Sequence, residues 1–184
     1  SDFGTATDGT PVHRITIGSE ELRASVLDWG AILQGVWMAG LDRNLTLGSE
    51  NLADYLPQMR SMGALVAPVV NRIAGAKAVI AGVEHRFAAN QSDRITLHSG
   101  PEAATHLRLW QMEEVAADRV LLAVDLPDGQ GGFPGNRHVS AEFRVTGAAL
   151  RMTVTATTDA PTLFNAANHS YWNLDGSTTF AGHR

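Results

Sequence analysis

Short stretches in which apolar and polar residues alternate recur along the chain, and a turn signal closes each of them. Residues 12–18 and 21–30 show this pattern clearly. Alternation with a period of two is typical of strands that bury one face. Strong helical patterns are scarce. Only residues 51–56 are expected to form a helical turn, with Asn51 as its N-cap and Pro57 as its end.

Three pairs of such stretches lie close enough along the chain to form hairpins. In the first, Ala81 and Gly82 supply a tight turn between two short strands. The hairpins span residues 77–88, 106–127 and 137–158, with turns at 81–82, 116–118 and 146–148. Strands at this spacing, with no helices between them, predict an all-β fold, an antiparallel β-sandwich or barrel. The length of 184 residues suits a single domain with a sizeable hydrophobic core.

Composition and charge narrow the function classes. The net charge is −5 and no segment gathers Lys or Arg, which argues against nucleic-acid binding. The absence of cysteine excludes disulfides and thiolate metal sites and permits a cytoplasmic location. No apolar run approaches the ~20 residues of a membrane span, and residues 1–10 lack a signal-peptide core. We therefore expect a cytoplasmic protein without membrane or nucleic-acid partners; the oligomeric state stays open.

Two loops depart from the alternating pattern. Residues 125–136 contain four glycines and two prolines, more than a hairpin turn needs. Residues 64–76 are apolar until Asn71 and Arg72 interrupt them. Because an unpaired buried charge is strongly destabilising, Arg72 must either reach solvent or meet a polar partner.

Several polar side chains in apolar or glycine-bounded positions form a candidate site. Neutral sugars are bound by fixed donors and acceptors for their hydroxyls and by aromatic faces that stack on the ring. A histidine adds a proton that can be given or taken near neutral pH. The candidates are Asn71, Arg72, His98, Asn168 and His169, with Tyr171, Trp172 and Phe133 as aromatic neighbours.

Simpler interpretations compete with these candidates. Taken alone, His98 at a strand end is more commonly a surface or hydrogen-bonded residue, and Arg72 is more commonly part of a structural ion pair. His169 has a stronger case, because alternation places it on one face with Asn165 and Ala167. A metal site on His98 and His169 lacks a third ligand at a useful spacing. The other histidines are expected to be solvated: His13, His85, His106, His138 and His183.

Five segments, in order along nearly the whole chain, resemble segments of the aldose 1-epimerases, also called galactose mutarotases. Residues 28–38 (DWGAILQGVWM) resemble an early family strand in which a Gly-Ala pair follows a turn. Residues 71–87 resemble the Asn-Arg-Ile segment with its hairpin, and LHSG at 97–100 resembles the Leu-His-Gly-Gly loop. Residues 127–136 resemble the glycine-rich Pro-Asp-Gly loop. The most specific match is NAANHSYWNL at 165–174.

The resemblance implies a galactose mutarotase-like supersandwich that interconverts the α and β anomers of a free hexose. It implies that His169 is the general acid that protonates the ring oxygen, while Arg72 and His98 hold sugar hydroxyls and help to place charge. Opening the ring needs an acid and a base that face each other across it, and it needs no metal or organic cofactor. The expected catalytic residues are His169 and His98. The expected substrate-binding residues are Arg72, Asn71, His98 and Asn168.

The chain also departs from the family pattern. Ala67 and Pro68 stand where members usually carry Gly-Arg, and Ser99 replaces the first glycine of the loop. Ala166 and Ala167 replace Leu-Thr. The missing arginine bears on the range of sugars more than on the reaction, so the preferred sugar stays open.

Length is the larger departure. The family's substrate-binding aspartate and basic glutamate lie beyond Arg184, so residues 1–184 are expected to be one β-sandwich domain that lacks its C-terminal strands and holds the acid half of the site. Residues 178–184 are expected to enter another strand. An engineered fragment, part of a longer chain and a short homologue stay open. We favour the first two, because half a sandwich would expose apolar sheet faces and strand edges.

Two other functions stay open at this point. One is a non-catalytic carbohydrate-binding domain that keeps the groove without the base. The other is an epimerase of hexose 6-phosphates. That substrate calls for a cluster of Arg or Lys, for which Arg72 alone is thin support.

Overall fold

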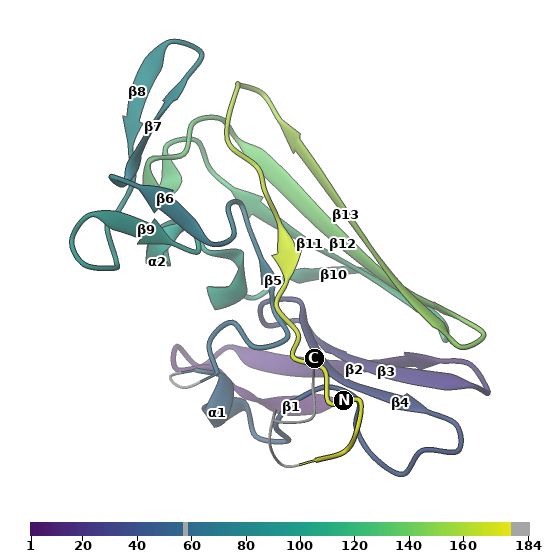
Figure 1. Ribbon diagram of the computed structural model, residues 1–184. Helices are drawn as coiled ribbons and strands as arrows, with labels where there is room; N and C mark the ends of the chain where they lie inside the picture. The colour runs from purple at the N-terminus through teal and green to yellow at the C-terminus, as the bar shows by residue number, and fades with distance from the viewer. Residues whose placement is uncertain (57–58, 178–184) are drawn as a thin grey trace.

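The computed structural model describes residues 1–56 and 59–177. Two four-stranded antiparallel sheets dominate it, and short strand pairs and single helical turns connect them (Figure 1). The predicted all-β, antiparallel fold is confirmed. In the described ranges, no helix has the length and apolar character needed to cross a membrane. The predicted strand at 178–184 and the predicted helix end at Pro57 lie outside the described residues.

The first sheet contains the N-terminal strands in sequence order. The two alternating stretches near the N-terminus form its second and third strands, as predicted. Ile15 and Ile17 are buried while Thr16 between them is exposed, which is the one-sided burial that alternation specifies. The strands are β1 (Asp2–Thr5), β2 (Pro11–Gly18), β3 (Leu22–Leu27) and β4 (Ile32–Met38).

The second sheet consists of the second and third predicted hairpins. Its two longest strands pair over ten residues, from Arg137 opposite Thr158 to Thr146 opposite Ala149. Thr146 therefore belongs to the strand rather than to the turn, which is shorter than predicted. The strands are β10 (Gln111–Val115), β11 (Arg119–Leu126), β12 (Arg137–Thr146) and β13 (Ala149–Thr158).

Shorter pairs join segments that are mostly far apart in the sequence. β5 (Leu65–Val66) pairs with β14 (Ala167–Asn168), and β6 (Arg72–Ala74) pairs with β9 (Ile95–Leu97). The first predicted hairpin is confirmed as β7 (Lys77–Ile80) and β8 (Val83–Arg86). Figure 1 shows β5 and β14 running between the two large sheets.

The helices are single turns. The predicted turn after Asn51 is confirmed as α1, where the Asn51 side chain accepts a hydrogen bond from the Ala53 N–H at 3.1 Å. The turns are α1 (Leu52–Tyr55), α2 (Gly100–Ala103) and the 3-10 turns η1 (Thr105–Leu107) and η2 (Gln130–Gly132).

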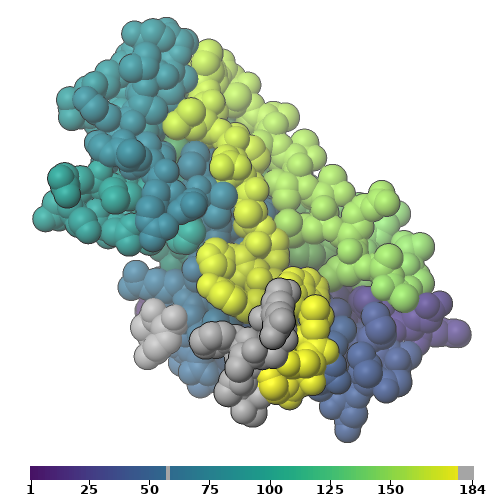
Figure 2. Space-filling model, viewed as in Figure 1, coloured from purple at the N-terminus to yellow at the C-terminus, as the bar shows by residue number. Residues whose placement is uncertain are grey.

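One apolar core lies between the two large sheets. It contains Ile17 of β2, Val26 of β3, Leu122 of β11 and Phe143 of β12, each at most 1% exposed. The last described segment, yellow in Figure 2, crosses the surface over the junction of the sheets. Its backbone bonds place residues 165–169 beside residues 63–70.

Candidate functional site

Two short strand pairs assemble the candidate site. In the pair β6–β9, Arg72 lies opposite Leu97. His98 directly follows Leu97, so Arg72 and His98 lie at the same end of the pair. Next to the pair β5–β14, the His169 N–H donates to the Ala64 carbonyl at 2.9 Å, and the His169 carbonyl accepts from the Gly63 N–H at 3.0 Å. Segments that are distant in sequence therefore present their polar residues to one place.

The rings of the two predicted catalytic histidines lie against each other. Their centroids are 5.3 Å apart and their planes are nearly perpendicular, at 88°. The ring of Tyr171 lies 5.4 Å from that of His169 on the exposed surface. His98 and His169 are both half-buried, so a ligand can reach them. The structure thus gathers His98, His169 and one predicted aromatic neighbour into a single cluster.

Asn71 fixes the tautomer of His98. The Asn71 N–H donates to Nδ1 of His98 at 3.1 Å, and the His98 N–H donates to the Asn71 carbonyl at 2.8 Å. Because Nδ1 accepts, the neutral ring carries its proton on Nε2 and offers it as a donor. Burial, together with the charges of His169 and Arg72, lowers the pKa of His98 and favours this neutral form. His98 is therefore equipped to donate a hydrogen bond from Nε2 to a ligand oxygen.

Arg72 reaches solvent and keeps its charge available. Its Nε donates to the Gln91 side-chain oxygen at 2.7 Å, and its Nη1 donates to that of Asn71 at 2.8 Å. Both partners are neutral amides. Within the described part of the chain no carboxylate forms an ion pair with Arg72. The simpler interpretation of Arg72, a structural ion pair, is therefore not supported there. The two amides orient the guanidinium without neutralising it.

Asn168 holds the backbone of the site. Its side-chain nitrogen donates to the Gly63 carbonyl at 2.9 Å, and its side-chain oxygen accepts from the Ser170 N–H at 3.1 Å. These contacts position the residues on both sides of His169. In the structure the Asn168 amide therefore orients its neighbours, whereas it was expected from the sequence to bind substrate.

His106 differs from the sequence expectation, which placed it in solvent. The residue is only 5% exposed, and its ring lies 5.9 Å from that of His98 at 83°. Burial, with the charges of His98 and His169, lowers its pKa to about 4. His106 is buried because it belongs to η1, and the Thr105 hydroxyl anchors this turn by donating to the Leu65 carbonyl at 2.7 Å. No local pattern signals this, because the anchor comes from a distant strand.

Phe133 is not available to stack on a sugar. Its side chain is fully buried, and its ring packs 4.4 Å from that of Phe87. The glycine-rich loop folds back on β8 and encloses the Phe133 side chain, so Phe133 is a core residue. Tyr171 and Trp172 are 49% and 46% exposed and remain accessible.

The other histidines lie away from the cluster. His138 is exposed, as expected, and its Nδ1 is 2.7 Å from the Asp125 carboxylate. His85 is half-buried rather than solvated. His13 also departs from the expectation, because its ring contacts the buried Asp28 carboxylate at 2.8 Å. His183 lies outside the described residues.

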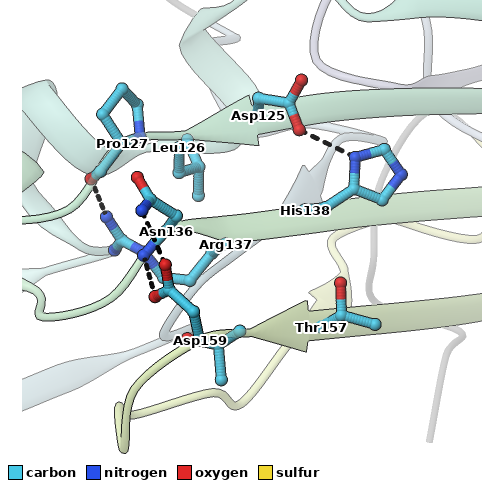
Figure 3. Close-up of a pocket in the computed structure, with 9 residues that line it drawn as sticks. Asp125, Leu126, Pro127, Asn136, Arg137, His138, Thr157 and Asp159 are labelled. Carbon is cyan, nitrogen blue, oxygen red and sulfur yellow. Dashed lines mark hydrogen bonds and ion pairs between the residues drawn. The ribbon is translucent and has the colours of Figure 1, made fainter.

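Two hollows on the surface differ in how free their polar groups are to bind a ligand. One, of about 440 Å³, lies at the end of β11, β12 and β13 (Figure 3). Its polar groups contact one another: His138 binds Asp125, Asn136 binds Asp159, and Arg137 donates to the Pro127 carbonyl. The other, of about 270 Å³, is lined by His98 and His106 and adjoins the candidate site. Over the described ranges, no group of three or more His, Cys, Asp or Glu is placed to hold a metal.

Comparison with known proteins gives consistent matches. Residues 13–184 match the family model described as Aldose 1-epimerase. The aldose 1-epimerase of Escherichia coli (strain K12) is 32% identical over 176 residues, which are 93% of this chain and 50% of that protein. The galactose mutarotase of Sus scrofa is 29% identical over 180 residues, 96% of this chain and 52% of that protein.

Solved structures agree. The GalM/aldose epimerase homologue from C. elegans superposes with a TM-score of 0.85 at 29% identity, over 92% of this chain and 53% of that one. Galactose 1-epimerase from Lactobacillus acidophilus NCFM superposes with a TM-score of 0.83 at 25% identity, over 95% and 52%. The chain spans about half the length of the curated relatives it matches. Since the family model matches almost its whole length, this chain belongs to the aldose 1-epimerase family.

Proposed function

We propose that this chain carries the acid half of a site that interconverts the α and β anomers of a free aldohexose. The observation that supports this most is the cluster of His169, His98 and Arg72, in which a half-buried imidazole faces a neutral hydrogen-bond donor beside an unneutralised guanidinium. Two curated relatives are named aldose 1-epimerase and galactose mutarotase. The hydrogen-bond donors of this cluster suit the same interconversion of anomers.

The proposed reaction moves protons only. His169 gives a proton to the ring oxygen as the C1–O5 bond breaks, and a base removes the proton of the C1 hydroxyl. The resulting aldehyde rotates about C1–C2, and the reverse transfers close the ring on its other face. His98 donates from Nε2 to a sugar oxygen, and Arg72 offers the guanidinium N–H groups that its amide partners leave free. Atoms and electrons balance without an external oxidant or reductant.

Polarimetry of freshly dissolved α-D-galactose and α-D-glucose tests this proposal. We expect a protein that contains both this chain and the base of the site to accelerate the change in optical rotation over a protein-free control. His169→Ala should slow it by ~10²–10⁴-fold, the usual contribution of an acid–base group. His138→Gln, which changes an exposed histidine elsewhere, is the matched control and should not change the rate.

A carbohydrate-binding domain without catalysis is the competing outcome. Titration calorimetry with the same sugars separates the two functions. Saturable sugar binding without accelerated mutarotation would replace the enzymatic proposal with the binding one. An unchanged rate in an active His169→Ala variant would remove His169 from the role of acid.

A further inference from the structure

His106 lies in a hollow that extends the candidate site beyond the two predicted histidines. Its ring lines the hollow of about 270 Å³ together with His98, Arg60, Ser61 and Asn90. His98 lines the hollow, and its ring also lies against that of His169, so the hollow adjoins the pair of predicted catalytic histidines. The ring of His98 lies against both other rings, at 5.9 Å from that of His106 and 5.3 Å from that of His169.

The ring of His106 has hydrogen-bonding capacity that the protein does not use. Its Nδ1 is enclosed and has no hydrogen-bond partner among the residues the structure describes. Buried polar atoms without a partner are rare in folded proteins, so bonding within the described residues does not explain an imidazole at this position. An aliphatic side chain would fill the same space without that cost.

The position of the ring does not depend on its nitrogens. Thr105 fixes the turn: its hydroxyl donates to the Leu65 carbonyl at 2.7 Å and accepts from the Ala67 N–H at 2.9 Å. The Trp110 indole N–H donates to the Thr105 carbonyl at 3.0 Å. These bonds fix η1 without either ring nitrogen of His106.

The chemistry of the ring selects the ligand group. Burial and the neighbouring histidines keep His106 neutral at physiological pH. The accessible nitrogen of a neutral imidazole is either a donor or an acceptor; a hydroxyl group can pair with either, whereas an anion needs a donor. We infer that His106 binds a hydroxyl of the sugar in the hollow beside His98 and so helps to select among aldoses. This inference rests on the proposed function, because it assumes a sugar at His98 and His169.

Imidazole NMR on the 15N-labelled chain tests the inference and the proposed function separately. Long-range 1H–15N spectra report the tautomer and environment of each histidine, assigned with single His→Gln variants. On addition of D-galactose or D-glucose we expect His98, His169 and His106 to shift while the exposed His138 does not. Shifts at His98 and His169 without one at His106 overturn this inference alone. No shift at any of the three overturns the proposed function and this inference with it.

Affinity measurements with deoxy sugars supply the sharper criterion. We expect His106→Leu to raise the Kd for the hexose ~10-fold, the equivalent of one lost hydrogen bond, and His106→Gln to restore most of the affinity. For the deoxy sugar that lacks the contacted hydroxyl, wild type and His106→Leu should bind equally. A His106→Leu protein that binds every sugar as wild type does, with only a lower Tm, would show that His106 is a core residue and overturn the inference.

Discussion

At the scale of single residues, the backbone around His98 adopts an uncommon conformation. His98, Ser99 and Gly100 follow one another with φ of 50°, 68° and 69°, in the left-handed region. For residues with a Cβ this conformation costs about 1–2 kcal/mol each, and such residues gather at functional sites. The Ser99 hydroxyl offsets part of that cost, because it accepts from the Val69 N–H at 2.8 Å and donates to the Val69 carbonyl at 3.0 Å. The strain is therefore held by bonds to the neighbouring loop.

Substitutions at Ser99 separate these two effects. Ser99→Ala removes both hydrogen bonds, leaves the buried Val69 amide unpaired and keeps the strain, so it should lower the free energy of unfolding by about 2–3 kcal/mol. Ser99→Gly loses the same bonds but relieves the strain, and should cost about 1 kcal/mol less. Denaturant unfolding of both variants measures the difference. Equal losses would show that the left-handed conformation is not strained.

His106 should make stability depend on pH. Its pKa is about 4 in the folded chain and 6.5 in a model peptide, so between these values the unfolded state binds more protons. Its contribution is fully present above pH ~6.5 and is lost as the pH falls toward ~4. The loss from pH 7 to pH 5 should be about 2 kcal/mol.

The matched comparison is the same pH series on His106→Gln. Its stability should change less between pH 7 and pH 5, a window above the range in which carboxylates titrate. His98, whose pKa is also lowered, contributes in the same direction in both proteins and cancels in the comparison. Identical pH profiles for the two proteins would contradict the assignment of a buried, neutral His106.

At the scale of elements, the sequence predicts what local turns determine. Ala81 and Gly82 have φ of 48° and 83°, as a tight hairpin turn requires, and Asn51 caps α1 through its own side chain. The pairs β5–β14 and β6–β9 were not predicted, because each joins short segments with weak patterns that are distant in the chain. Their pairing is set by tertiary contacts rather than by local sequence.

The same distinction applies to the candidate site. His98, His169, Arg72 and Asn71 could be proposed together because residue type and motif single them out, and the structure places them together. Burial of His106 depends on Thr105 bonding to a distant strand, so no local sequence pattern predicts it. For the same reason, the sequence could show that the glycine-rich loop is unusual but not that it encloses a side chain.

That glycine-rich loop offers a test at the scale of an element. Gly132 has φ of +86°, and a Cβ there would lie 2.0 Å from the Arg86 carbonyl oxygen at the end of β8. Gly132→Ala should therefore combine backbone strain with a clash and lower the free energy of unfolding by about 2–4 kcal/mol. Gly129→Ala, at φ +74° with open space around its Cβ, should cost only about 1 kcal/mol. Equal costs would show that the loop does not dock closely on β8.

At the scale of the whole molecule, the two large sheets share one core. Ile17 and Val26 of the first sheet belong to the same buried cluster as Leu122 and Phe143 of the second. Neither sheet can bury its apolar face without the other. A shared core of this kind predicts one cooperative folding unit. The single domain expected from the sequence should therefore unfold in one transition.

Phe143 is the position at which to test that cooperativity. Its side chain is fully buried in the shared core, so Phe143→Ala should lower the free energy of unfolding by about 3–5 kcal/mol. Met112→Ala, on β10 and 40% exposed, is the matched control and should cost less than about 1 kcal/mol. Amide NMR signals from β3 and from β12 should disappear at the same denaturant concentration in each protein. If the signals of β12 were lost before those of β3 in Phe143→Ala, the sheets would fold as separate units and the shared core would not make the molecule cooperative.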